Sequence, residues 1–119
     1  MPGEVLAAIS SEMVRLKAHS FGKGPVEAKT YECDDFLFCV MRGVATRAEQ
    51  VLISSGDKRV VRDFRLAFQE RMRPEFVGAV DRITNRRVLT YESQILFEPD
   101  TTVEIFLLEN GAEAAEAPA

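Results

Sequence analysis

The sequence contains few of the residues from which most active sites and metal centres are built. His19 is the only histidine, and Cys33 and Cys39 are the only cysteines. A Ser–His or Cys–His nucleophile pair would have to use His19, and no nucleophile elbow, Walker A motif or zinc-ligand spacing is present. We therefore predict no catalytic residues, no metal site and no cofactor, with a hydrolase built on His19 as the remaining enzymatic alternative.

Long apolar runs and excess positive charge are also missing. No apolar run approaches the roughly 18 residues that a membrane span requires, and the N-terminus has no basic-then-apolar signal peptide. The net charge of −4 and the pI near 5.1 argue against a generic binder of the phosphate backbone. These features predict a soluble, cytoplasmic protein without direct membrane insertion, and they disfavour nucleic acid as a partner.

The composition that remains is that of an ordinary globular domain. Of the 119 residues, 46% are hydrophobic and 29% are charged, which is far from the low hydrophobicity of disordered chains. We predict a single domain over residues 3–109. Residues 110–119 are rich in Ala and Glu and contain a Pro, so we expect a disordered tail there.

Residues 57–84 form the longest periodic stretch and predict the helix around which the core is built. Apolar side chains recur there at steps of three and four: Val61, Phe64, Phe68, Met72, Phe76, Val80 and Ile83. Pro74 predicts a kink or break near Met72 and Arg73, so that the stretch counts as two helices. A first helix is expected over residues 4–20, and a short one over residues 47–54, where Thr46 and Glu49 fit a capping box.

Four strands are expected at residues 26–33, 36–42, 87–97 and 102–108, in two hairpins turned at Asp34-Asp35 and at residues 98–101. A two-residue turn at Asp34-Asp35 sets Cys33 opposite Phe36 and Cys39 on the other face, which excludes a disulfide. Along the chain the expected elements are a helix, a hairpin, further helices and a second hairpin. An α-β-β unit therefore occurs twice. This repeat predicts an α+β fold of two α-β-β units, forming a four-stranded antiparallel sheet with helices on one face.

Apolar residues fall on both faces of the second and fourth strands, although a sheet covered on one side usually alternates apolar with polar residues. We therefore predict that the face without helices binds another copy of the chain or another protein, and we expect a homodimer. The alternative is that the C-terminal tail or the short helix covers this face. The residues predicted for the interface are Leu37, Cys39, Met41, Phe106 and Leu108.

A small-anion sensor is an alternative function. Lys23 lies in a glycine-rich segment, and Arg42 and Thr46 flank the start of the short helix, where free N–H groups and the helix dipole favour an anion. The structural alternatives are that Lys23 follows a helix stop and that Arg42 pairs with a carboxylate such as Glu49.

An RNA-binding module is a further alternative. It rests on a basic stripe along the long helix, formed by Lys58, Arg62, Arg65, Gln69 and Arg73. Acidic residues interrupt the surroundings of this stripe, so a solvated helix face is the structural alternative.

Several short motifs carry a family resemblance over residues 3–109: Gly22-Lys23-Gly24-Pro25, Arg42-Gly43, Thr46-Arg47 with Glu49, Arg65 with Phe68-Gln69-Glu70 and Met72, Phe97 with Pro99-Asp100, and Val103-Glu104-Ile105-Phe106. With these the chain resembles the MpsC-like family of small prokaryotic domains of unknown function, which is associated with a Na+-translocating, membrane-potential-generating system. The resemblance implies a non-enzymatic interaction or regulatory module, accessory to membrane ion or inorganic-carbon transport. A membrane transport subunit is therefore an expected partner.

Overall fold

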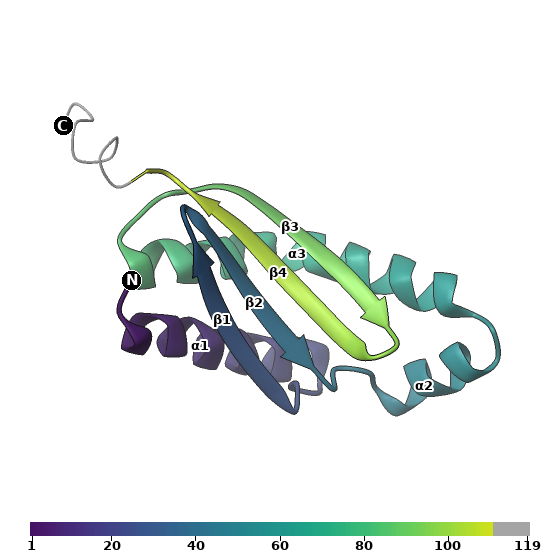
Figure 1. The fold of residues 1–119 in the computed structure, drawn as a ribbon. Coiled ribbons are helices and arrows are strands. Elements are labelled where there is room, and N and C mark those ends of the chain that lie inside the picture. The colour runs from purple at the N-terminus through teal and green to yellow at the C-terminus, as the bar shows by residue number, and fades with distance from the viewer. Residues whose placement is uncertain (111–119) are drawn as a thin grey trace.

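The structure, a computed structural model, describes residues 1–110 and contains three helices and four strands there (Figure 1). In chain order these are α1 (Gly3–Phe21), β1 (Glu27–Cys33), β2 (Phe36–Arg42), α2 (Arg47–Ser54), α3 (Lys58–Thr84), β3 (Val88–Phe97) and β4 (Asp100–Leu108). The predicted order of elements is confirmed. The disordered tail predicted for residues 110–119 lies, except for Asn110, outside the described residues.

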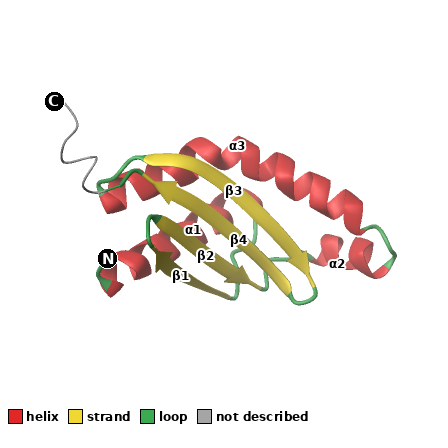
Figure 2. Cartoon of the chain, turned by 45° about the horizontal axis from the view of Figure 1, so that its top comes forward, coloured by secondary structure: helices red, strands yellow, loops and turns green. Residues whose placement is uncertain are grey.

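The strands form one antiparallel sheet in the order β1-β2-β4-β3, so the two hairpins join through their second strands. α1 and α3 lie against the same face of this sheet, and α2 packs against α3 beyond the end of β2 (Figures 1 and 2). The predicted fold class, two α-β-β units that form a four-stranded antiparallel sheet with helices on one face, is confirmed. β2 and β4 occupy the centre, and β1 and β3 form the edges.

The first hairpin has the predicted register. Asp34 adopts a left-handed backbone with φ 53°, and Cys33 pairs with Phe36 across the two-residue turn. Cys39 pairs with Thr30 and is buried, whereas Cys33 is exposed, and both cysteines are free. The two thiols therefore lie on opposite faces of the sheet, as expected.

α3 runs without interruption from Lys58 to Thr84, so the predicted break near Met72 and Arg73 is wrong. Proline at position 74 removes one helical hydrogen bond, to the carbonyl four residues earlier at Glu70. Pro74 and Glu70 are both exposed, so water can bind the carbonyl that lost its donor. Packing of the turns on both sides against the sheet and α1 then holds the helix together.

The apolar stripe predicted for α3 is mostly buried, with one exception. Val61, Met72, Phe76 and Val80 all lie in the core, but Phe64 is 54% exposed. The helix surface that faces the sheet in the first half of α3 carries polar side chains instead: Arg65 and Gln69, each 3% exposed. Phe64 stands beside this surface and contacts the ring of Phe21 at a centroid distance of 5.9 Å.

The connection from β2 to α2 is shaped by Gly43 and Thr46. Gly43 has φ 69°, and a Cβ there would lie 2.6 Å from Val26 Cγ2. Position 43 therefore has no room for a side chain. Thr46 then begins α2 with the predicted capping box. Its Oγ1 accepts from the Glu49 N–H at 3.2 Å, and its own N–H donates to Glu49 Oε1 at 2.9 Å.

Candidate functional site

One face of the sheet is turned away from α1 and α3 (Figure 2). This face carries an apolar strip two strands wide. We call it the open strip, and its six residues are Phe36, Phe38 and Val40 on β2, paired with Leu107, Ile105 and Val103 on β4. Five of them are half-buried by their neighbours on the sheet, and Phe36 is 38% exposed. Within residues 1–110, neither long helix lies over this strip.

Both edges of the open strip are polar. Lys29 and Tyr31 on β1 pair with the β2 side of the strip, and Glu92 and Gln94 on β3 pair with the β4 side. Lys29 Nζ lies 5.0 Å from the centroid of the Tyr31 ring. An apolar centre with a polar rim is the usual anatomy of a protein–protein interface.

The residues predicted for the interface are on the other face, so that assignment is wrong. Leu37, Cys39 and Met41 are each 0% exposed, Phe106 is 0% and Leu108 is 2% exposed, and all five belong to the core under α1 and α3. Both faces of β2 and β4 are apolar, so residue type alone does not show which face the helices cover. The alternate residues of the same two strands lie on the face turned away from α1 and α3.

The three residues predicted to hold an anion all have partners within the chain. Lys23 Nζ donates to the Ala45 carbonyl at 2.8 Å. Arg42 lies on the open face, where Nε is 3.1 Å from Glu27 Oε1, and the N–H of Thr46 is bonded to Glu49. The pairing of Arg42 with a carboxylate is the alternative that the geometry supports, and anion binding at these three residues stays a prediction.

The anion at the start of α2 is the side chain of Glu49 itself, which is 5% exposed. The guanidinium of Arg65 on α3 donates two hydrogen bonds to this carboxylate, with Nε 3.0 Å from Oε2 and Nη2 3.2 Å from Oε1. Asp100 at the start of β4 accepts the Ala45 N–H at 2.8 Å through Oδ2, and its Oδ1 lies 3.8 Å from Arg65 Nη1. This buried cluster joins α2, α3 and β4.

A second buried cluster surrounds Glu104 of β4, which is 0% exposed. Gln69 Nε2 donates to its Oε1 at 2.5 Å, Ser93 Oγ donates to its Oε2 at 2.5 Å, and the Tyr91 hydroxyl donates to Oε2 as well. Lys17 of α1 brings its Nζ to 3.5 Å from Oε1. Four elements thus share one carboxylate, whose charge is balanced by a buried ammonium.

Burial shifts the pKa of the groups around Glu104. Desolvation lowers the pKa of the Lys17 ammonium, and the nearby Glu104 carboxylate opposes that shift. Burial, with the negative charge of Glu104, raises the pKa of the Tyr91 hydroxyl far above its usual range, so Tyr91 stays a proton donor. The arrangement is that of a structural network, with its hydroxyl and carboxylate fixed in complementary roles.

The basic stripe predicted on α3 is not a continuous solvated surface. Arg65 and Gln69 are buried in the two clusters described above. Arg62 lies over the Phe97 ring at 5.0 Å, Arg73 lies over the Tyr91 ring at 5.0 Å, and Lys58 pairs with Glu98 at 3.3 Å. Because these cations are engaged by the sheet and by carboxylates, the geometry does not favour RNA binding.

Two sequence signals for the buried clusters were overlooked. Lys17 follows Ile9 and Met13 at steps of four on α1, which places an ammonium on the apolar face of that helix. Glu104 lies at steps of two from Thr102 and Phe106 on β4, so it shares their face of the strand, which is the buried one. A charge on each of two facing apolar surfaces is the pattern of a buried ion pair.

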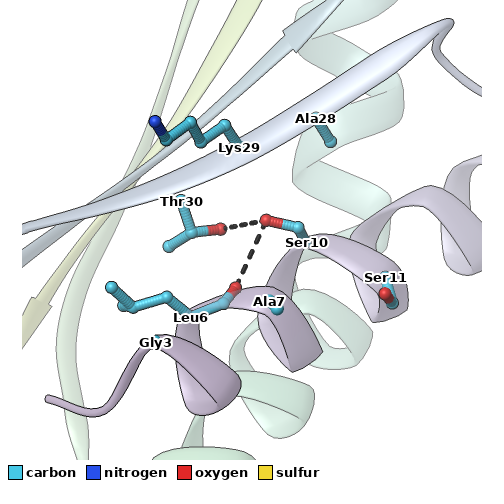
Figure 3. A pocket seen from close by; sticks show the side chains of 8 residues that line it. All are labelled: Gly3, Leu6, Ala7, Ser10, Ser11, Ala28, Lys29 and Thr30. Atoms are coloured by element: carbon cyan, nitrogen blue, oxygen red, sulfur yellow. Dashed lines mark hydrogen bonds between the residues drawn. The ribbon is translucent and has the colours of Figure 1, made fainter.

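A groove of about 410 Å³ lies between α1 and β1 (Figure 3). Its walls are mostly small side chains, and Ser10 and Thr30 face each other there, with their hydroxyl oxygens 2.7 Å apart. Lys29 is the one ionisable side chain of this lining, which contains no carboxylate, histidine or cysteine.

The part of the chain that the structure describes is residues 1–110. No group of three or more His, Cys, Asp or Glu side chains in this part of the chain is placed to hold a metal ion. None of its helices combines the length and apolar character needed to cross a membrane.

Treatment of the native protein with a thiol reagent near pH 8 is expected to modify Cys33 and spare Cys39. Burial raises the pKa of the Cys39 thiol to about 11, so almost no thiolate is present, and the side chain is 0% exposed. Intact-mass analysis should show one adduct on the native protein and two after unfolding. Equal labelling of both cysteines in the native protein would contradict the burial of Cys39.

These features define the class: a small α+β protein of two α-β-β units, with two polar clusters buried under its sheet and an apolar strip on the open face. Residues 2–110 match the family model described as Na+-translocating membrane potential-generating system (MpsC), and the chain belongs to this family. The resemblance drawn from the sequence is thereby confirmed. Comparisons with curated proteins and with solved structures found no match.

Proposed function

We propose that this chain is a non-enzymatic interaction or regulatory module, accessory to a membrane ion-transport system, and that the open strip is its binding surface. The observation that supports this is the row of six apolar side chains on the sheet face that neither long helix covers within residues 1–110, bordered by polar residues. Fully burying such a side chain contributes roughly 1.5–3 kcal/mol. A partner that covers several of them, even from their half-buried state, gains enough to stay bound.

A second copy of the chain is the occupant that the charges on the two rims favour. Lys29 lies on the β1 rim and the exposed Glu92 on the β3 rim. A two-fold axis parallel to the central strands sets the β1 rim of each copy over the β3 rim of the other. Lys29 then lies opposite Gln94 and two residues along the strand from Glu92, and this arrangement occurs twice. Two sheets packed in this way form a sandwich about 10 Å thick. We therefore propose a homodimer.

Replacing Ile105 with lysine is expected to shift the protein from dimer to monomer at micromolar concentration. Ile105 lies in the middle of the strip, opposite Phe38, and a dimer would bury the new ammonium of each copy against apolar side chains. Light scattering coupled to size-exclusion chromatography measures the mass, and circular dichroism checks the fold. Val60→Lys is the control, because Val60 is 55% exposed on α3, away from the sheet face.

A wild-type protein that stays monomeric as its concentration rises would contradict the proposed homodimer. An Ile105→Lys variant that dimerises as well as the wild type would place the dimer interface elsewhere. A loss of dimerisation in Val60→Lys equal to that in Ile105→Lys would also count against the strip.

The membrane partner follows from the family description, which names a Na+-translocating system. We propose that the dimer meets a subunit of that system from the cytoplasm. Tagged wild-type protein is expected to recover an identified subunit of an ion-translocating complex from gently solubilised host membranes, and Val60→Lys should do the same. Failure of the wild type to recover any such subunit would contradict the membrane role and leave the test of the dimer intact.

A further inference from the structure

A small, partly enclosed cavity lies between the two buried polar clusters. Its volume is about 10 Å³. A single water molecule needs roughly 10–15 Å³ of such space. The residues that line the cavity are Lys17, Phe21, Val44, Arg65, Phe68, Gln69 and Thr102.

Three of these residues each bring a buried polar atom without a hydrogen-bond partner: Arg65 Nη1, Gln69 Oε1 and Thr102 Oγ1. The residues are 3%, 3% and 0% exposed. The carboxylate oxygen paired with Arg65 Nη1, Asp100 Oδ1, is 3.8 Å away, which is beyond hydrogen-bond distance. Buried polar atoms are nearly always bonded, so three of them on residues that line one cavity point to a bound ligand.

We propose that this cavity binds one ordered water molecule. The three atoms comprise a donor on Arg65, an acceptor on Gln69 and a hydroxyl on Thr102 that serves as either. Water accepts from the guanidinium and donates to the amide oxygen and the hydroxyl. Three hydrogen bonds are the usual number for a buried water in a protein.

The charges around the cavity favour a neutral ligand over an ion. Lys17 and Arg65 line its wall, and their positive charges repel a metal cation. Their partners Glu104 and Glu49 offset that charge, so an anion gains no net attraction. A halide is also larger than a water molecule and exceeds the available space.

The water links the two clusters into one network. On one side, Arg65 holds Glu49 of α2. On the other side, Gln69 holds Glu104 of β4, which pairs with Lys17 of α1. A water bonded to both Arg65 and Gln69 continues the hydrogen bonds across the core. The resulting network connects all three helices and the central strand β4.

Oxygen-17 magnetic relaxation dispersion of the intact protein tests the proposal, because it detects long-lived internal water. The variant is Thr102→Val, which keeps the shape of the side chain and removes the hydroxyl. Its matched control is Thr101→Val, since the neighbouring hydroxyl is also buried but accepts from Arg42 at 3.5 Å on the open face. We expect the signal of one long-lived water in the wild type and in Thr101→Val, and its loss in Thr102→Val.

A wild type without a long-lived water overturns the proposal, and so does a Thr102→Val variant that keeps the full signal. If Thr102→Val does not fold, a high-resolution crystal structure of the wild type decides instead. A water peak about 2.7–3.2 Å from the three atoms supports the proposal. An empty cavity, or an anomalous peak there after soaking in rubidium bromide, overturns it in favour of no ligand or of an ion.

Discussion

Replacing Glu104 with alanine is expected to lower the free energy of unfolding by about 3–5 kcal/mol, the range observed when one partner of a buried ion pair is removed. The carboxylate is 0% exposed and accepts hydrogen bonds from Gln69, Tyr91 and Ser93. Without it, these donors lose their acceptor, and the ammonium of Lys17 remains buried without a counter-charge. Most of this decrease in the free energy of unfolding comes from the buried polar partners that are left unpaired.

Urea unfolding followed by circular dichroism measures this change. The double variant Lys17→Met with Glu104→Leu is expected to recover part of the loss, because it removes the buried ammonium left without a counter-charge, while Gln69, Tyr91 and Ser93 still lack their acceptor. Glu70→Ala is the matched control, since Glu70 forms an exposed pair with Arg73. Equal unfolding midpoints for Glu104→Ala and Glu70→Ala would mean that the Lys17–Glu104 cluster does not stabilise the core.

Replacing Phe76 with alanine is expected to cost about 3–5 kcal/mol, as truncation of a buried phenylalanine usually does. Phe76 is 0% exposed in the second half of α3, and its ring lies edge-on to that of Tyr91 at 6.1 Å. Alanine leaves a cavity between the helix and the sheet that α3 closes only in part. It also removes the aromatic contact that helps to orient Tyr91 toward Glu104.

Phe64→Ala provides the comparison for Phe76→Ala, because both remove the same side chain from the same helix. Phe64 is 54% exposed, so we expect its truncation to cost clearly less. The sequence assigned both residues to one apolar stripe, whereas the structure separates them. Equal changes in the two unfolding midpoints would show that Phe64 is buried in solution, as the sequence pattern predicted.

The parts of the fold that local chemistry determines were predictable. The turn at Asp34-Asp35 fixes the register of the first hairpin, and that register places Cys33 and Cys39 on opposite faces without any knowledge of the helices. The capping box of Thr46 and Glu49 marks the start of α2 in the same way. In each case residues close in the chain make the contacts that define the structure.

The side of the sheet that the helices cover was not predictable in this way. Met41 and Val40 are adjacent apolar residues, and only the packing of α1 and α3 decides that Met41 enters the core and Val40 faces outward. The burial of Lys17 and Arg65 also depends on contacts with residues distant in the chain, Glu104 and Glu49. Such pairs become visible only when the tertiary arrangement is known.

The start of α2 shows how a sequence pattern can indicate the chemistry of a site without identifying all of its partners. The start of α2 does hold a negative group beside an arginine, as the sequence suggested. The group is the carboxylate of Glu49, and the arginine is Arg65 rather than Arg42. A glutamate three residues after the capping threonine already supplied the charge, so the helix start has no need of a dissolved anion.

The pairing of the two hairpins through β2 and β4 has a consequence for how the chain folds. Each hairpin forms from neighbouring residues, but the central pairing joins Phe36 to Leu107 and so requires a long loop to close. Until it closes, each α-β-β half presents an unpaired strand edge, which is prone to aggregate. The chain should therefore acquire its stability in one late, cooperative step, and either half expressed alone should be insoluble.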